Sequence, residues 1–115
     1  MIQRHELEPP VLANVVATAS TVFTAGCIAD DTSQDIKGQT RQALADVDKY
    51  LALCGSDKSK ILSAVIWLSD IRLREAMNEV WTAWLAPGHA PARACVENKM
   101  ADPRMLVEIM FIAAR

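Results

Sequence analysis

The sequence contains few of the residues that are abundant in specialised classes of protein. Its 115 residues include only four glycines and five prolines, far fewer than collagen-like or low-complexity chains contain. The 51% of hydrophobic and 23% of charged residues are instead typical of a folded globular protein. A chain of this length can bury one hydrophobic core but not two, so we expect a single domain over residues 1–115.

An excess of positive charge is also missing. Twelve Lys and Arg residues against fourteen Asp and Glu residues give a formal net charge of -2, and no stretch concentrates the basic residues. Proteins that bind nucleic acid neutralise its phosphates with clustered Lys and Arg. We therefore expect no nucleic-acid partner. A ribonuclease is disfavoured for the same reason and because His5 and His89, both expected at the surface, lie far apart.

No apolar run approaches the roughly 18 residues that span a bilayer, and charges in Met1–Glu6 stand where a signal peptide would be apolar. We expect a cytoplasmic protein without a membrane partner. The three cysteines, Cys27, Cys54 and Cys95, are odd in number and form no CxxC pair or Cys/His cluster. This pattern favours reduced thiols and predicts no metal site.

Two segments have the periodicity of amphipathic helices. Apolar residues recur every three or four positions from Ile36 to Cys54. Thr32 or Ser33 is expected to cap this helix, and Gly55 to end it in the left-handed conformation. Asp70 is expected to begin a second helix, which Pro87-Gly88 ends. The apolar face of that helix contains Leu73, Ala76, Met77, Val80, Trp81 and Trp84.

The other regular segments are predicted to be strands. Residues 14–28 predict two strands joined by a tight turn, 61–68 a central strand, and 92–97 and 105–114 two further strands. In Ile61–Leu68, Leu62 is expected on the same apolar face as Ala64, Ile66 and Leu68. The order ββαβαββ predicts an α+β domain, a mixed sheet of five to six strands with two helices packed on one face. The other face, with Val65 and Trp67, then needs a cover, which predicts an oligomer.

One charge, Glu108, interrupts the apolar final strand Met105–Ala114. Burying a carboxylate is costly unless a cation accompanies it or its pKa rises. A hairpin about Asn98–Arg104 would place Arg93 almost opposite Glu108. A cross-strand salt bridge is the simpler interpretation. The alternative is a site in which Arg93 grips a carboxylate with its planar fork and Glu108 moves a proton to or from water.

Three further residues are considered together with Arg93 and Glu108. Cys95 shares a strand face with Arg93 and is expected to line the same pocket; no histidine is placed to make it a nucleophile. Asn78, in the second helix, either faces solvent or reaches the sheet edge. Gly26, inside a strand pattern, indicates a bulge or a close approach of another group to the backbone.

Several short motifs combine these residues. They are Thr24–Ile28, Gln39-Thr40, Ala43-Leu44, Met77-Asn78 with Trp81, Pro91–Val96, and Val107–Ile109 with Ala113–Arg115. Through them, over nearly the whole chain, the sequence resembles the YjgF/RidA family of reactive imine deaminases. The most specific are P-x-R-x-x-V, which contains Arg93, and V-E-I, which contains Glu108.

The resemblance implies a chorismate-mutase-like α+β subunit that forms a homotrimer, in which the sheets build a barrel and the active sites lie between subunits. It implies an enzyme that hydrolyses enamines and imines such as 2-aminoacrylate, which pyridoxal-phosphate enzymes or amino-acid oxidation release, to 2-oxo acids and ammonia. No cofactor is implied. By position, Arg93 would bind the substrate carboxylate, the backbone at Cys95 the imine nitrogen and Glu108 the attacking water. Asn78 would support the pocket.

The sequence departs from the family pattern on one side of that pocket. The family's G-P-Y segment has no counterpart in Glu8–Asn14, and its S-G-Q reads Ala25-Gly26-Cys27. These departures indicate a side branch of the family. The alternative function is a non-catalytic trimeric module that binds small carboxylates such as 2-oxo acids and has a regulatory role.

Overall fold

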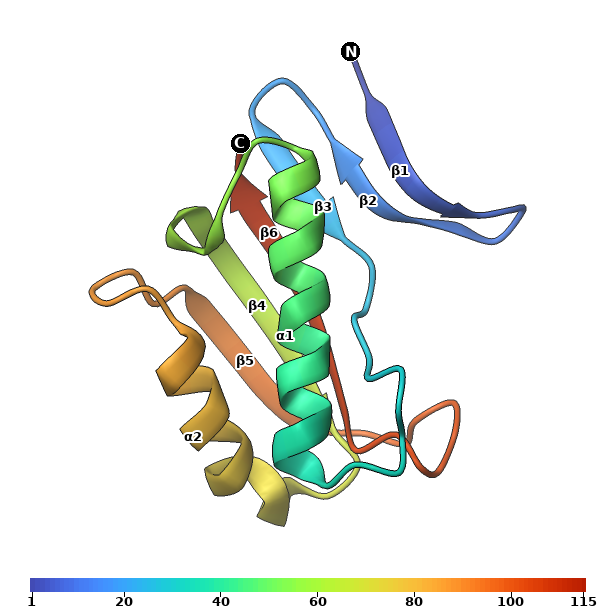
Figure 1. The fold of residues 1–115 in the computed structure, drawn as a ribbon, viewed down its shortest axis with the longest axis vertical. Coiled ribbons are helices and arrows are strands. Elements are labelled where there is room, and N and C mark those ends of the chain that lie inside the picture. The colour runs from blue at the N-terminus through green and yellow to red at the C-terminus, as the bar shows by residue number, and fades with distance from the viewer.

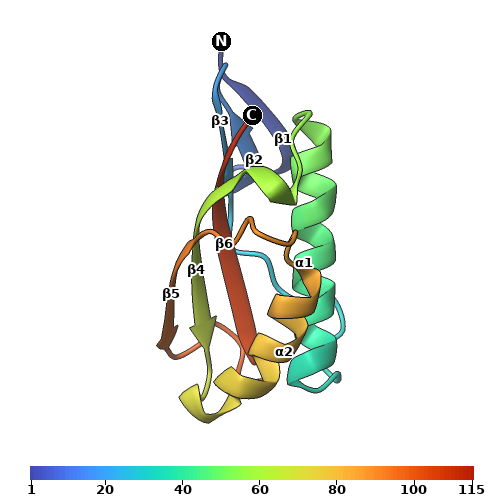
Figure 2. The same cartoon turned by 90° about the vertical axis from the view of Figure 1, so that its left-hand side faces the viewer.

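Six strands form one mixed sheet, and two helices cover one face of it in the computed structural model of residues 1–115 (Figures 1 and 2). The elements are β1 (Gln3–Glu8), β2 (Leu12–Ala17), β3 (Thr21–Thr24), α1 (Ile36–Leu53), β4 (Ile61–Leu68), α2 (Arg74–Trp84), β5 (Ala92–Glu97) and β6 (Val107–Ala114). The strand order is β1-β2-β3-β6-β4-β5, and only β4 and β5 are parallel. The predicted α+β architecture is therefore confirmed.

Helix α1 lies along the sheet with its apolar stripe inward. Its N-cap is Asp35, whose side chain accepts a hydrogen bond from the Gly38 backbone N–H, so the expected cap at Thr32 or Ser33 was wrong. A carboxylate at this position also suits the positive end of the helix dipole. Gly55 follows the helix with φ +70°, as predicted for a residue that ends a helix in the left-handed region.

Helix α2 begins one turn later than expected. The Asp70 side chain caps a short 3-10 turn, Ile71–Leu73, and the α-helix starts at Arg74. Met77, Val80 and Trp81 on its inner face are buried, which confirms the predicted apolar face. This face packs on the sheet beside α1 (Figure 1).

The central strand β4 differs from the prediction at one end. A register shift between Ile61 and Ser63 buries Ile61 and leaves Leu62 55% exposed. A bulge adds one residue to the strand and so reverses the alternation before it, which pattern counting alone does not foresee. Beyond the bulge, Ala64, Ile66 and Leu68 face the helices as expected.

The sheet has an N-terminal strand that the sequence did not reveal, so the order begins with three strands, not two. Strand β1 pairs only with β2 and is largely polar and exposed, so it lacks the apolar alternation that marks a half-buried strand. His5 in this strand is half-buried, with a buried Nε2 that has no hydrogen-bond partner, whereas His89 is exposed as expected.

The predicted hairpin between the last two strands was wrong. Strand β4 lies between β5 and β6, parallel to the first and antiparallel to the second. The connection from β5 to β6 crosses the end of β4: the Asn98 N–H donates to the Leu68 carbonyl, and the Ser69 N–H donates to the Leu106 carbonyl. The segment β4-α2-β5 is thus a parallel crossover, and β6 returns on the far side of β4.

One face of the sheet has no helix over it (Figure 2). This face, here called the open face, includes Phe23, Val65, Trp67, Met110 and Ile112, and Phe23 is 41% exposed. The prediction of a face without a cover is confirmed; the oligomer inferred from it stays a prediction. None of the helices has both the length and the apolar character needed to cross a membrane.

Candidate functional site

Arg93 lies on the edge strand β5 and points toward α2. Its Nη1 donates a hydrogen bond to Oδ1 of Asn78 at 2.7 Å, and its Cζ lies 5.3 Å from the centre of the Trp81 ring. Asn78 and Trp81 are three residues apart on α2 and so share one helix face. Of the two positions open to Asn78, the structure shows the one that reaches the sheet edge.

The Arg93 guanidinium has no carboxylate partner within the chain. Three other arginines, Arg72, Arg74 and Arg104, form ion pairs with acidic residues one or two positions away, but Arg93 forms none. Asn78 is its one hydrogen-bond partner, so most of its five N–H donors remain available. A half-buried cation with a free planar fork is suited to bind a small carboxylate.

Cys95 follows Arg93 by two positions on the same strand face and is half-buried. Burial raises the pKa of the Cys95 thiol, although the nearby Arg93 and Arg74 act in the opposite direction. A raised pKa disfavours the thiolate, which is the nucleophilic form of cysteine.

Glu108 lies elsewhere, near the start of β6 and opposite Trp67 on the open face. Its carboxyl group packs directly over the backbone of Gly26: a Cβ built at Gly26 would lie 2.7 Å from the Glu108 Cδ, closer than real side chains approach. The interpretation of Gly26 as a point of close approach is confirmed. The next residue, Cys27, pairs with Ile109 through two backbone hydrogen bonds of 2.7 and 3.0 Å, which fix this arrangement.

A cavity of about 350 Å³ opens beside Glu108. Its acidic lining residues are Glu8, Asp30, Asp46 and Glu108 itself, and no Lys or Arg lines it. Burial raises the pKa of the Asp46 carboxyl, and the charge of Asp30 raises it further. A larger groove of about 530 Å³ lies between α1 and α2, but it contains none of Asn78, Arg93, Cys95 and Glu108.

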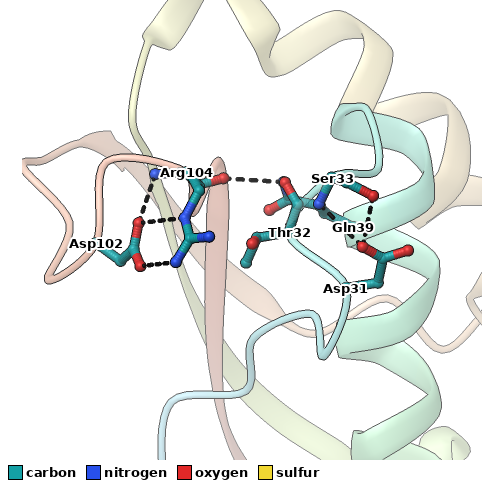
Figure 3. Close-up of polar contacts among 6 residues, drawn as sticks. All are labelled: Asp31, Thr32, Ser33, Gln39, Asp102 and Arg104. Carbon is teal, nitrogen blue, oxygen red and sulfur yellow. Dashed lines mark hydrogen bonds and ion pairs between the residues drawn. The ribbon is translucent and has the colours of Figure 1, made fainter.

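Gln39 supports the chain segment that leads into β6 and Glu108. In the sequence it was noted only as part of the motif Gln39-Thr40. Its side chain is buried; its Nε2 donates to the carbonyls of Thr32, Gln34 and Arg104, and its Oε1 accepts from the Leu106 N–H. Figure 3 draws Gln39 between the loop before α1 and the connection that leads into β6. A glutamine inside an apolar helix stripe was the available signal, because a buried amide needs partners.

Arg93 and Glu108 do not meet within one chain, so the predicted contact and its cross-strand salt bridge were wrong. Arg93 is in register with Ala64, whereas Glu108 is in register with Trp67, three residues along β4. Three residues along the strands and two strand spacings across them separate the two Cα atoms by about 14 Å. Their side chains also leave opposite faces of the sheet. A site that uses both needs a second copy of the chain.

Comparison with known proteins places this fold. The family model for Endoribonuclease L-PSP matches residues 9–115. A RutC family protein of Haemophilus ducreyi is 42% identical over 92 residues, which are 80% of this chain and 79% of that protein. An uncharacterized protein from Pseudomonas aeruginosa has a solved structure with a TM-score of 0.96 and 39% identity, covering 100% of this chain and 99% of its own. A YjgF family member from Neisseria meningitidis has a TM-score of 0.95 and 38% identity, covering 100% and 95%.

The six-stranded sheet, its two helices and the arginine on the edge strand therefore define an α+β protein with the YjgF-like fold. The chain belongs to the YjgF/RidA family, whose model carries the description Endoribonuclease L-PSP, and to its RutC branch. The family resemblance inferred from the sequence motifs is thereby confirmed.

Proposed function

We propose that this protein hydrolyses reactive enamines and imines of the 2-aminoacrylate type to 2-oxo acids and ammonia. One observation carries the proposal: Arg93 is half-buried, held by Asn78 and Trp81, and has no carboxylate partner of its own. Such a cation is prepared for an external carboxylate, and a 2-imino acid has a carboxylate next to the carbon that reacts. Membership of the YjgF/RidA family supports the same reaction class.

In this mechanism the chain positions the reactants and handles one proton. Arg93 binds the carboxylate, and the backbone at Cys95 on the edge strand lies near the imine nitrogen. Glu108 accepts a proton from water as its oxygen bonds to the imine carbon. The imine nitrogen takes up the proton that Glu108 accepted, and the resulting carbinolamine passes its hydroxyl proton to the amino group and loses ammonia to leave the 2-oxo acid. An enamine such as 2-aminoacrylate first tautomerises to the imine. Because imines hydrolyse readily in water, positioning and one proton-handling carboxylate are sufficient.

The proposed site lies between copies of the chain. Arg93 and Glu108 are on opposite faces of the sheet in one subunit, so Arg93 of one copy works with Glu108 of the next. The open face and the free outer edge of β5 provide the surfaces for this contact. We propose a homotrimer, in which a cyclic arrangement gives each of three sites one arginine and one glutamate.

A coupled assay tests the reaction. An amino-acid oxidase generates 2-imino acids in place, and the release of ammonia and 2-oxo acid is followed with and without the protein. Faster release from at least one imine supports the proposal. No acceleration for any imine, together with binding of 2-oxo acids by calorimetry, would replace it with the binding module that the sequence left as the alternative.

The description of the family model raises ribonuclease as a second reaction, and no observation on this chain favours it. The net charge of -2 and the acidic cavity beside Glu108 repel a phosphate backbone. Neither histidine lies near Arg93 or Glu108 in the sheet register: His5 pairs with Val15, and His89 precedes β5 in an exposed loop.

A further inference from the structure

Trp81 supports Arg93 in a way that ordinary core packing does not require. The indole is 5% exposed, and its ring is nearly parallel to that of Phe111, at 12° and 5.8 Å between centroids. Phe111 is itself 1% exposed and lies in the central part of β6. The ring below Arg93 is therefore fixed in position by the core of the protein.

The guanidinium contacts this pair of rings through Trp81. Arg93 Cζ lies over the Trp81 ring, 5.3 Å from its centre, and the same ring packs against Phe111. Indole has the most favourable face for a cation among the aromatic side chains, and the attraction grows when water is excluded. The Trp81 ring restrains the guanidinium by this contact, while the hydrogen bond to Asn78 fixes it at one nitrogen.

We propose that Trp81 is a positioning residue for carboxylate binding: its ring holds the Arg93 guanidinium in the orientation that presents the remaining N–H donors to the substrate. This inference rests on the proposed role of Arg93. Without the ring, Asn78 alone leaves the guanidinium free to rotate about a single hydrogen bond, and ordering it again opposes binding.

Trp84 provides a matched control within the same aromatic cluster. It lies 6.0 Å from Trp81 and 5.9 Å from Phe111, so its loss disturbs the same part of the core. Its polar contacts lead away from Arg93, because its Nε1 donates to Asp48 and Lys58 lies over its ring. A purely structural role of the cluster predicts similar effects for the two tryptophans, whereas a positioning role predicts an effect of Trp81 alone.

Binding of pyruvate, measured by calorimetry on the assembled protein, tests the inference. We expect W81L to weaken binding about tenfold, W81F to retain affinity within about threefold because it keeps an aromatic face, and W84L to bind like the wild type. Wild-type affinity in W81L, or equal losses in W81L and W84L, would overturn it. If W81L does not fold, W81F should still bind pyruvate about two- to threefold more weakly than W84L, because the phenyl face attracts a cation less strongly than the indole face, and equal affinity of these two variants overturns the inference.

A spectroscopic measurement separates this inference from the proposed reaction. In the wild type, the ring current of Trp81 should shift the Arg93 side-chain Nε–H proton upfield, and the shift should persist in W84L and be lost in W81L. An unshifted signal in the wild type means that the guanidinium does not lie over the Trp81 ring, whatever the activity. A shifted signal in a protein that binds pyruvate but turns over no imine would leave the positioning role standing and remove the deaminase proposal.

Discussion

The two ends of the candidate site are built by opposite means. Arg93 is surrounded by side chains that hold it: Asn78 bonds one nitrogen and Trp81 lies against the guanidinium face. The Glu108 carboxyl group fits because position 26 is a glycine, which has no side chain. Gly26 leaves the space that the carboxyl group occupies. The first end faces the helices and is cationic. The second lies on the open face beside an acidic cavity. In the proposed mechanism, the residue that binds the anion and the residue that handles the water come together only when copies of the chain assemble.

The largest effect is expected from the cationic end. Arg93→Ala should reduce kcat/KM for imine hydrolysis by about a hundredfold or more, because it removes the only proposed carboxylate anchor. Arg93→Lys should also be poor, since lysine keeps the charge but loses the planar two-point contact. The coupled oxidase assay gives the rates, and light scattering checks that the assembly is unchanged. Wild-type turnover by Arg93→Ala would remove Arg93 from the site.

Mixed assemblies test whether the two ends meet between copies. Arg93→Ala and Glu108→Gln should each be nearly inactive, but refolding them together in equal amounts should restore about one quarter of wild-type activity in randomly mixed rings. A quarter is expected because each site then draws its arginine and its glutamate independently. A site within one chain predicts no recovery. A stable monomer by light scattering would also contradict the proposed site.

The glycine at the second end should matter for the rate and little for binding. Gly26→Ala places a Cβ where the Glu108 carboxyl group now lies, so we expect kcat to fall roughly tenfold to a hundredfold while pyruvate affinity stays within about threefold. Gly55→Ala is the matched control. Gly55 has φ +70° with nothing near its missing Cβ, so alanine there should cost about 1 kcal/mol of stability and leave turnover unchanged. Equal rate losses in both variants would assign the effect to the fold.

The contrast between the ends also explains what the sequence could predict. Local patterns were sufficient for both helices, for β4 and for the segments of β5 and β6, because burial on one face imposes a period of 3.6 or 2. Arg93, Cys95, Asn78 and Gly26 were singled out from the same patterns. Strand β1 was missed because Gln3–Glu8 is largely polar and exposed. The reversal at Leu62 was missed because a bulge leaves no periodic trace.

The relation between Arg93 and Glu108 was the main failure, and its cause is topological. A turn-rich connection between two strands fits a hairpin as well as a crossing over one strand end, and local sequence does not distinguish them. Here β4 takes the central place because its edges pair with β5 on one side and β6 on the other. Candidate residues could therefore be chosen from the sequence, but their arrangement within one subunit could not be predicted.

Substitution of Gln39 should destabilise the fold next to Glu108. Gln39→Leu would leave the carbonyls of Thr32, Gln34 and Arg104 and the Leu106 N–H without their side-chain partner. We expect a loss of about 3 kcal/mol and a decrease of roughly 10 °C in Tm, measured by thermal unfolding. Gln42→Leu, which removes a single hydrogen bond to the Asp31 N–H, should cost no more than about 1 kcal/mol. Equal Tm values for the two variants would contradict the role assigned to Gln39.

The smallest expected effect is a change in Tm when Asp46, in the acidic cavity, is substituted. The opposite change is expected when Asp31 is substituted. Burial and the charge of Asp30 raise the pKa of Asp46 above its ordinary 3.8, so the folded state binds this proton more tightly than the unfolded state. Stability therefore falls as pH rises from about 3.8 through the higher folded value, and the loss persists at neutral pH. Asp46→Asn should raise Tm at pH 7 by at most about 4 °C, given its partial exposure, and the gain should vanish below pH 3.8.

Substitution of Asp31 is expected to change Tm in the opposite direction. Hydrogen bonds from the Ser33 side chain and from Gln34 lower the pKa of its carboxyl, so its contribution to stability is present above its ordinary pKa and is lost as pH falls through the lower folded value. Asp31→Asn should therefore lower Tm at pH 7, with the difference shrinking in acid. Thermal unfolding of both variants between pH 3 and 8 gives the comparison, and a decrease in Tm at pH 7 in Asp46→Asn would show that the cavity beside Glu108 does not penalise negative charge.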